Sequence, residues 1–160
     1  MKAKKRAASA NAIRQAELIL KLYELRRETV MREARSYVGG GEFKPASGRE
    51  LVEIVTTGGK RGSFVLQVFG YWDMVAAFVQ HGALDAGLVH DTCQEMYFQY
   101  AKIQPHLKEF RKAMNLPEWM ISIERLVEGS KAGRARLATM QKSLSAMGGV
   151  QKAPAKKRTA

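Results

Sequence analysis

The segment from residue 64 to residue 79 constrains the fold more than any other, because it carries two apolar stripes side by side. One stripe is Phe64, Val68, Tyr71, Val75 and Phe78, and the other is Val65, Phe69, Trp72, Ala76 and Val79. Both advance in steps of three and four residues, the spacing of one face of an α-helix. A helix with two adjacent apolar faces is buried on most sides. We therefore predict that this helix, capped by Ser63, is the centre of the fold.

Helical spacing recurs along the rest of the chain, and no segment alternates steadily between apolar and polar side chains as a β-strand does. We expect further helices over residues 11–38, after a Ser47 cap, over residues 85–114 with a kink near Pro105, and over residues 117–147. A chain of 160 residues with 46% hydrophobic content is the size of one ordinary domain. The predicted fold is an all-α, single-domain bundle of about five helices.

The first of these helices has one irregular position in its apolar stripe. The stripe is Ile13, Ala16, Leu20, Tyr23, Val30, Ala34 and Tyr37, and Arg27 occupies the slot between Tyr23 and Val30. An arginine on a core stripe either extends to solvent or meets a carboxylate, and Asp73 and Glu95 are the candidate partners. We expect a buried ion pair between Arg27 and Asp73 that fixes how two helices pack; the alternative is that these groups line a ligand cleft.

The sequence "HGALDAGLV", residues 81–89, belongs to a part of the chain in which histidines, aspartates and the single cysteine lie close together. Such a group suggests either a metal site or a corner between two helices. Gly82 suits the left-handed residue that ends a helix, and Asp85 suits the cap that begins the next. Leu84 and Val89 have the spacing of a hydrophobic staple across that cap. His90 and Cys93 are a usable but generic ligand pair, and Cys93 continues the apolar stripe of its helix. We therefore predict a corner, with Cys93 buried and no metal.

The formal net charge of +12 invites a nucleic-acid partner, but most of it lies at the two ends of the chain. Residues 1–10 and residues 148–160 each hold four basic residues and no acidic residue. Both segments are poor in apolar surface, so we expect disordered basic tails around a helical bundle domain of residues 11–147. Such tails either contact phosphate backbones or anionic lipid, or they keep the chain soluble.

The sequence offers no sign of export or membrane insertion. The basic start of the chain lacks the unbroken apolar run of a signal peptide. The apolar segment of residues 64–79 contains Gln67 and Asp73 and is shorter than the roughly 20 residues of a membrane span. Cys93 is the single cysteine, which excludes an intramolecular disulfide. These features predict a cytoplasmic protein without a transmembrane segment.

No catalytic constellation is recognisable. None of the three histidines belongs to a recognisable nucleophile constellation, and no HExxH or CxxC motif is present. Residues 128–136, "EGSKAGRAR", lack the P-loop spacing and its preceding strand. The first hypothesis is therefore a non-catalytic helical interaction module, without a cofactor, that binds a protein partner or a second copy of itself. An enzyme with a site around His90, Asp91 and Glu95 is the least favoured hypothesis.

The alternative hypothesis is a non-specific nucleic-acid-associated protein that acts through its tails and a basic face of the last helix. Its candidate contacts are Lys4, Lys5, Arg6, Lys131, Arg134, Arg136, Lys156, Lys157 and Arg158.

Three stretches, "KLYELRRETVMREAR", "YWDMVAAFVQHGALD" and "YFQYAKIQPHLKEFR", carry a further signal. Together they resemble a family of short helical, mostly bacterial proteins known as a domain of unknown function, over about residues 18–114. The resemblance implies a compact helical module, with no established activity, substrate or cofactor.

Overall fold

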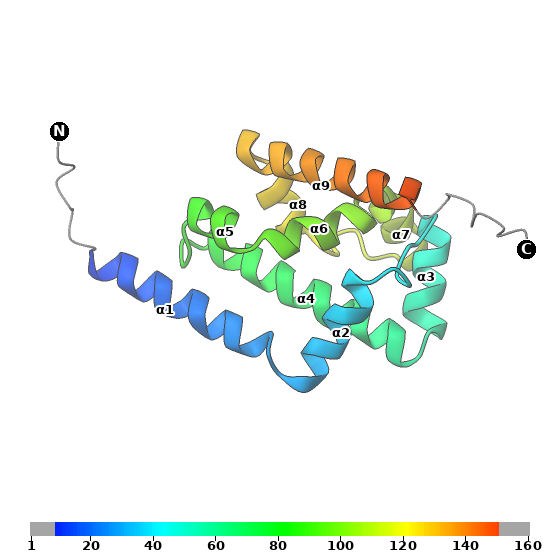
Figure 1. The fold of residues 1–160 in the computed structure, drawn as a ribbon, viewed down its shortest axis with the longest axis horizontal. Helices are drawn as coiled ribbons and strands as arrows, with labels where there is room; N and C mark the ends of the chain where they lie inside the picture. The colour runs from blue at the N-terminus through cyan, green and yellow to red at the C-terminus, as the bar shows by residue number, and fades with distance from the viewer. Residues whose placement is uncertain (1–8, 151–160) are drawn as a thin grey trace, which may run out of the picture.

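The computed structural model describes residues 9–150, and the regular elements in that range are all helical (Figure 1). In chain order they are α1 (Ala10–Leu25), α2 (Thr29–Gly39), α3 (Gly48–Thr57), α4 (Lys60–Gln80), α5 (Ala86–Thr92), α6 (Gln94–Ile103), the 3-10 helix η1 (Gln104–His106), α7 (Leu107–Met114), α8 (Ile121–Glu128) and α9 (Lys131–Val150). The predicted all-α fold is confirmed. The expectation of about five helices is wrong, because three of the expected helices are divided.

Helix α4 is the centre of the fold, as its two apolar stripes predict. Most side chains of both stripes are buried, and Trp72 is only 1% exposed. The predicted cap at Ser63 is wrong, because the helix begins at Lys60 after Gly59, whose φ of 55° is readily adopted by glycine. Ser63 lies inside the helix and its hydroxyl donates to the carbonyl of Gly59 at 3.3 Å.

Among the helices of residues 9–150, α4 is the one whose length and apolar composition would allow it to cross a membrane. Half of its most apolar stretch is buried within the protein body, where α4 packs against α2, α3 and α8. This burial is the pattern of a core helix.

The helix expected over residues 11–38 is divided at an elbow, residues 26–28, between α1 and α2. At the end of α1, side chains occupy two backbone carbonyls. The hydroxyl of Tyr71 donates to the Leu22 carbonyl at 2.7 Å, and Arg35 donates to the Arg26 carbonyl at 3.0 Å. The last carbonyls of a helix lack partners within it, so such donors stabilise a helix end. The elbow is therefore a stabilised end of α1.

The two later helices are divided as well. A break at Cys93, where φ is −111° and ψ is 50°, separates α5 from α6, and Pro105 lies in the 3-10 segment between α6 and α7. Helix α8 begins at Ile121, later than the expected Pro117, and α9 begins after Ser130, whose hydroxyl accepts from the Gly133 N–H at 2.9 Å. These breaks divide the two expected helices into α5, α6, η1 and α7, and into α8 and α9.

The predicted corner between α4 and α5 is confirmed. Gly82 has a left-handed φ of 72°, and the Asp85 carboxylate accepts from the Leu88 N–H at 2.9 Å. Leu84 and Val89 are 2% and 0% exposed, as a hydrophobic staple requires. Cys93 is also buried, as predicted.

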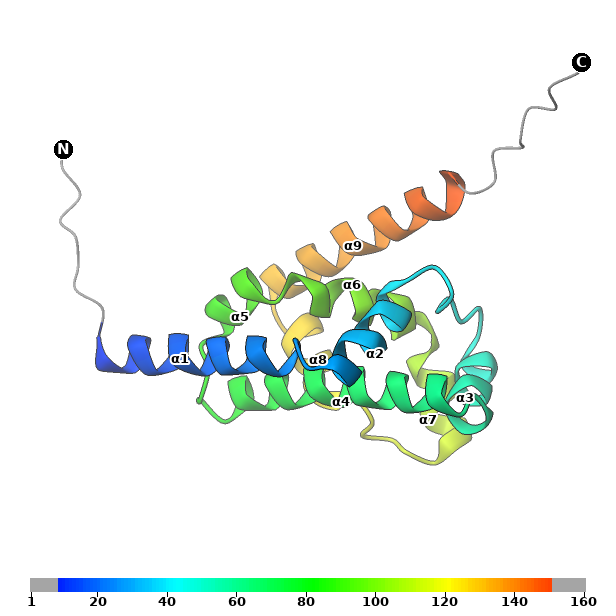
Figure 2. The ribbon, with the colours of Figure 1, turned by 60° about the horizontal axis from the view of Figure 1, so that its bottom comes forward.

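The helices pack around α4 as an irregular bundle (Figure 2). The closest pairs in the described residues are α2 with α4, α4 with α8, α6 with α9, and α3 with α7. Helix α1 is in none of these pairs, and Figures 1 and 2 both show it along the outer edge of the body.

The expected boundaries of the bundle domain fall near the two ends of the described chain. Helix α1 begins at Ala10 after a Ser9 cap, and α9 continues to Val150, past the expected start of the second tail at residue 148. Residues 1–8 and 151–160 lie outside the described residues.

Candidate functional site

The outer face of α1 is apolar and uncovered. Ile13, Leu20 and Tyr23 are 50%, 63% and 55% exposed, and Ala16 between them is exposed as well. We call these four residues the outer stripe. They are the first half of the stripe that the sequence predicted to be buried, so that prediction is wrong for α1. Val30 of the same predicted stripe is 55% exposed on α2.

The core takes up a different face of α1. Leu22 is 5% exposed, and Leu18 and Ile19 pack against the core while partly buried. The Gln15 side chain on the same side accepts from the Asp85 N–H at 2.8 Å. Helix α1 therefore has an inner apolar face that attaches it to the body and an outer stripe that points away from it.

A row of charged residues runs beside the outer stripe, each one residue after a member of that stripe. We call Arg14, Glu17, Lys21 and Glu24 the charged row, and all four are exposed. Neighbours in the row are three or four residues apart and opposite in sign, a spacing that also supports the helix itself.

The elbow is held by a part-buried ion cluster. Arg35 binds Glu95 through two hydrogen bonds, Nε to Oε1 at 2.7 Å and Nη2 to Oε2 at 2.5 Å, and Arg26 pairs with the same carboxylate. Burial opposes ionisation of Glu95, but the Arg35 hydrogen bonds and the Arg26 charge outweigh it and lower the pKa of Glu95. One carboxylate from α6 thus fixes two arginines across the elbow.

Further contacts tie this cluster to the core. The Gln99 amide donates to Glu95 at 2.8 Å and accepts from the Trp72 indole N–H at 2.6 Å. The Arg26 guanidinium lies 5.0 Å from the ring centroid of Trp72 and 5.3 Å from that of Tyr23. The elbow is therefore continuous with the centre of the bundle, so α1 has a defined direction.

The expected pair between Arg27 and Asp73 is wrong. Arg27 is exposed at the elbow, and the preceding residue, Arg26, is the buried arginine with 9% exposure. The Asp73 carboxylate accepts from the Ile123 N–H at 2.9 Å, in the first turn of α8. A carboxylate there satisfies an amide that the helix leaves unpaired, which explains Asp73 structurally. Glu95, the other candidate, is the partner of the arginines.

His90, which was considered for metal binding and catalysis, bonds with neighbouring side chains of the protein. His90 is 5% exposed, its Nδ1 bonds with the Tyr97 hydroxyl, and its Nε2 lies 3.5 Å from the Ser130 hydroxyl. Burial and the nearby Arg136 charge lower the pKa of His90. Within residues 9–150, no group of three or more histidine, cysteine, aspartate or glutamate side chains is placed to hold a metal ion.

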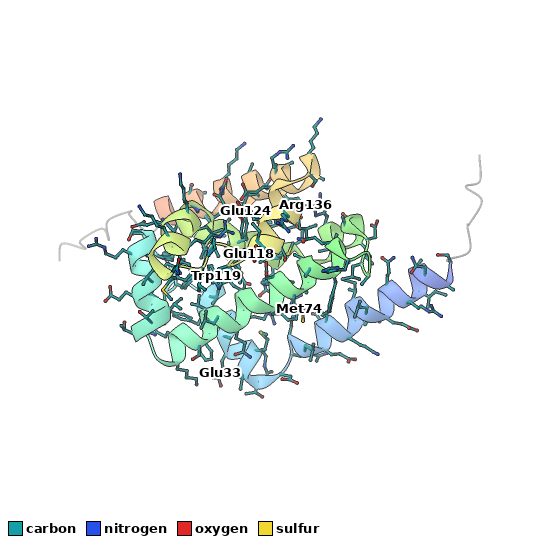
Figure 3. The ribbon with its side chains drawn as sticks, turned by 180° about the vertical axis from the view of Figure 1, so that it is seen from behind. Glu33, Met74, Glu118, Trp119, Glu124 and Arg136 are labelled. Carbon is teal, nitrogen blue, oxygen red and sulfur yellow. The ribbon has the colours of Figure 1, made fainter. Side chains whose placement is uncertain are left out.

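The basic face expected on the last helix is partly engaged within the protein. Figure 3 labels Arg136, one of its residues. Arg136 pairs with Asp91 at 2.6 Å, and Arg134 donates to the Glu128 carbonyl at 2.5 Å, while Lys131 is exposed. The other candidate nucleic-acid contacts lie outside the described residues; these are Lys4, Lys5, Arg6, Lys156, Lys157 and Arg158.

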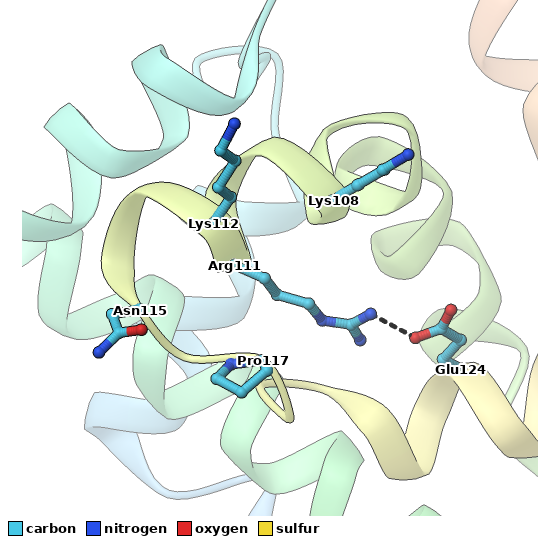
Figure 4. A pocket seen from close by; sticks show the side chains of 6 residues that line it. All are labelled: Lys108, Arg111, Lys112, Asn115, Pro117 and Glu124. Atoms are coloured by element: carbon cyan, nitrogen blue, oxygen red, sulfur yellow. Dashed lines mark ion pairs between the residues drawn. The ribbon is translucent and has the colours of Figure 1, made fainter.

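An open pocket of about 500 Å³ lies between α7 and α8 (Figure 4). Its lining is Lys108, Arg111, Lys112, Asn115, Pro117 and Glu124. Arg111 spans it, donating from Nε to the Trp119 carbonyl at 2.8 Å and pairing with Glu124 at 2.5 Å. The loop it holds includes left-handed Asn115 and Met120, with φ of 53° and 61°. Arg111 is best understood as a clamp on this loop.

Sequence reasoning missed one more cation. Lys102 of α6 donates to three carbonyls at the end of α2 and just beyond it, those of Val38, Gly40 and Phe43, at 2.6, 2.8 and 3.3 Å. Burial, together with the nearby charge of Lys44, lowers the pKa of Lys102 to about 8. Its acceptors come from a segment about 60 residues away in the sequence, so no local pattern could have indicated it.

Comparison with known proteins gives one finding. A family model described as a domain of unknown function, DUF4760, matches residues 11–130. The match includes nearly all of α1 and the helices up to α8, and it stops at the break before α9. A search of curated proteins found no match, and a search of solved structures found none. The resemblance noted from the sequence is confirmed and runs beyond residues 18–114: the chain belongs to the DUF4760 family.

Proposed function

We propose that the protein is a non-catalytic helical interaction module and that α1 is its docking element. The observation that carries this proposal is the outer stripe, in which Ile13, Leu20 and Tyr23 are each at least half exposed on one helical face. Isolated exposed apolar residues are normal on a protein surface. An aligned set with the spacing i, i+3, i+7 and i+10 is the pattern by which helices dock into partners.

The energetics favour covering this stripe. Full burial of an exposed isoleucine or leucine side chain stabilises by about 1.5–3 kcal/mol. Ile13 and Leu20 are 50% and 63% exposed, so roughly half of that gain for each remains for a partner. The ion cluster of Arg26, Arg35 and Glu95 holds α1 in one direction before any partner binds. A docking helix that is already ordered loses less conformational entropy on binding.

The alternative function, non-specific association with nucleic acid, has weaker support. Two of its three candidate contacts on α9, Arg134 and Arg136, already bind groups of the protein itself. That alternative therefore depends on the basic tails, and it predicts binding to duplex DNA that falls steeply as salt is raised. The interaction module requires no cofactor and is proposed to act in the cytoplasm.

Site-specific photo-crosslinking in cells that make the protein tests the proposal. Benzoylphenylalanine in place of Leu20 should give a discrete adduct with a protein, because that position is 63% exposed on the outer stripe. The matched control carries the same group in place of Ala138, an exposed position on α9. Equal yields at both positions, or no adduct at residue 20, would contradict docking through α1. An adduct with nucleic acid would favour the alternative.

A further inference from the structure

We infer that the partner of α1 is α1 of a second copy of this chain, packed against it in antiparallel orientation. This inference rests on the proposed function, since it names the occupant of the same surface. Two independent patterns on α1, one apolar and one charged, support it. The spacing of each pattern is the same when it is read from either end of the helix, and reversal places residues of opposite charge against each other.

The outer stripe can pair with the outer stripe of an antiparallel second copy. The outer stripe advances by steps of three, four and three residues, which read the same in either direction. In an antiparallel pair centred near residue 18, Ile13 lies opposite the partner's Tyr23, and Ala16 lies opposite the partner's Leu20. A small residue then faces a large one twice across the two-fold axis, so the helices can approach closely while burying both leucines.

The charge pattern selects the same arrangement. Along the charged row the signs alternate as Arg14, Glu17, Lys21 and Glu24, again in steps of three, four and three. In the antiparallel pair, Arg14 faces the partner's Glu24, and Glu17 faces the partner's Lys21. In a parallel, in-register pair the two charged rows would lie on opposite sides of the helix pair and could not meet. Charge complementarity therefore favours a second copy and sets its direction.

The two patterns have two-fold axes that nearly coincide, and an axis between residues 18 and 19 leaves each pair displaced by only about 1.5 Å. The outer stripe is centred on residue 18 and the charged row on residue 19, an offset of about 1.5 Å along a helix. The whole of α1, at 16 residues, is long enough for all eight residues to be paired at once. Helix α1 lies along the outer edge of the body, so its outer face is open to a second molecule (Figure 2).

The expected interface is small. A single pair of helices of about 24 Å buries less surface than the roughly 1,200 Å² of stable complexes. We therefore expect a dimer that dissociates on dilution, with a dissociation constant of roughly micromolar order.

Sedimentation equilibrium of the full chain over a range of concentrations tests the pairing. The wild-type protein should shift from monomer to dimer as concentration rises, and Leu20→Asp should stay monomeric at every concentration. The matched control is Leu116→Asp, which places the same charge on a leucine of similar exposure, 45%, outside α1, and which should dimerise normally. Circular dichroism confirms that each variant is folded. A wild-type monomer at all concentrations, or a dimer that survives Leu20→Asp, would overturn the inference.

Charge exchange tests the orientation. Glu17→Lys should weaken the dimer about tenfold, and the double variant Glu17→Lys with Lys21→Glu should restore it, because the exchange keeps every antiparallel pair opposite in sign. A spin label in place of Asn11 should lie about 20 Å from its copy, since the two positions are offset by about 14 residues of helix rise. Two labels side by side, or no rescue by the double variant, would rule out the antiparallel pair.

These results separate the inference from the proposed function. If the purified protein is monomeric while the crosslinker at residue 20 captures a different protein, the self-pairing is wrong and the interaction module stands. If residue 20 captures nothing, both are wrong.

Discussion

Helices α1 and α4 both carry two apolar stripes, but the protein covers them differently. On α4 most of both stripes is buried, whereas on α1 the inner face packs against the core and the outer stripe is exposed. The difference lies in the neighbours, because α4 packs against α2, α3 and α8 and α1 has the core on one side alone. Helical spacing shows which residues share a face. What covers that face is decided by the rest of the molecule or by another molecule.

The largest expected effect is on the buried side of this comparison. Trp72→Ala should lower the free energy of unfolding by about 3–5 kcal/mol, because it leaves a cavity and removes the donor to Gln99. Tyr23→Ala, at a large aromatic residue on the exposed stripe, should lower it by no more than about 1 kcal/mol in the monomer, through loss of the ring's contact with Arg26. Urea unfolding at low protein concentration measures both. Similar losses in the two variants would show that the outer stripe is covered within the monomer.

A second, smaller contrast, again between a buried and an exposed side chain, lies at the elbow that joins α1 to α2. Arg26→Met should cost about 2–3 kcal/mol, since it removes a charge-assisted hydrogen bond to Glu95 and a contact with Trp72. Arg35 still neutralises Glu95 in that variant, which limits the loss. Arg27→Met, one residue further on and exposed, should be nearly silent. Urea unfolding of this adjacent pair checks the assignment, and a larger loss for Arg27→Met would reverse it.

A third prediction concerns the pH dependence of stability that buried His90 causes. Burial lowers the pKa of His90, so below its ordinary value of 6.5 the unfolded chain binds a proton that the folded chain does not. The free energy of unfolding should therefore be highest above pH 6.5 and should fall as the pH is lowered towards 5. Glu95, whose pKa is also lowered, stays ionised over this range. The urea midpoint measured at pH 7.5 and pH 5.5 reports this. His90→Gln, which cannot gain that proton, should show a smaller difference between the two pH values than wild type.

The parts of the fold that the sequence predicted are those with local signals. Gly82 and Asp85 end one helix and begin the next through their own backbone and side-chain chemistry, so the corner between α4 and α5 was predictable. The division between α1 and α2 was not, because its donors, Tyr71 and Arg35, act on carbonyls brought close by folding. Nothing in the spacing of residues 11–38 indicates where those donors lie.

The sequence predicted the type of interaction at the elbow, an arginine paired with a carboxylate, but not the residues that form it. An arginine near position 27 facing a carboxylate was expected, and Glu95 was among the candidate partners, but the end of α1 at Leu25 places Arg26 inward in place of Arg27. The outer stripe was noted as a stripe and assigned to the core, since periodicity is the same for a face covered by its own chain and one covered by another.

The smallest expected effect in dilute solution distinguishes those two kinds of cover. Leu20→Ser should change the unfolding free energy of the monomer by less than about 0.5 kcal/mol, because the side chain is 63% exposed. At high protein concentration the variant should be less stable than wild type, since association that involves only the folded chain raises stability as concentration increases. Thermal unfolding at two concentrations, about a hundredfold apart, measures this, with Leu116→Ser as the control for an exposed leucine elsewhere. A wild-type Tm that does not rise with concentration would mean that the outer stripe contributes nothing through self-association. A rise that Leu20→Ser abolishes and Leu116→Ser does not would mean that both faces of α1 are covered, the inner face by its own chain and the outer face by a second copy.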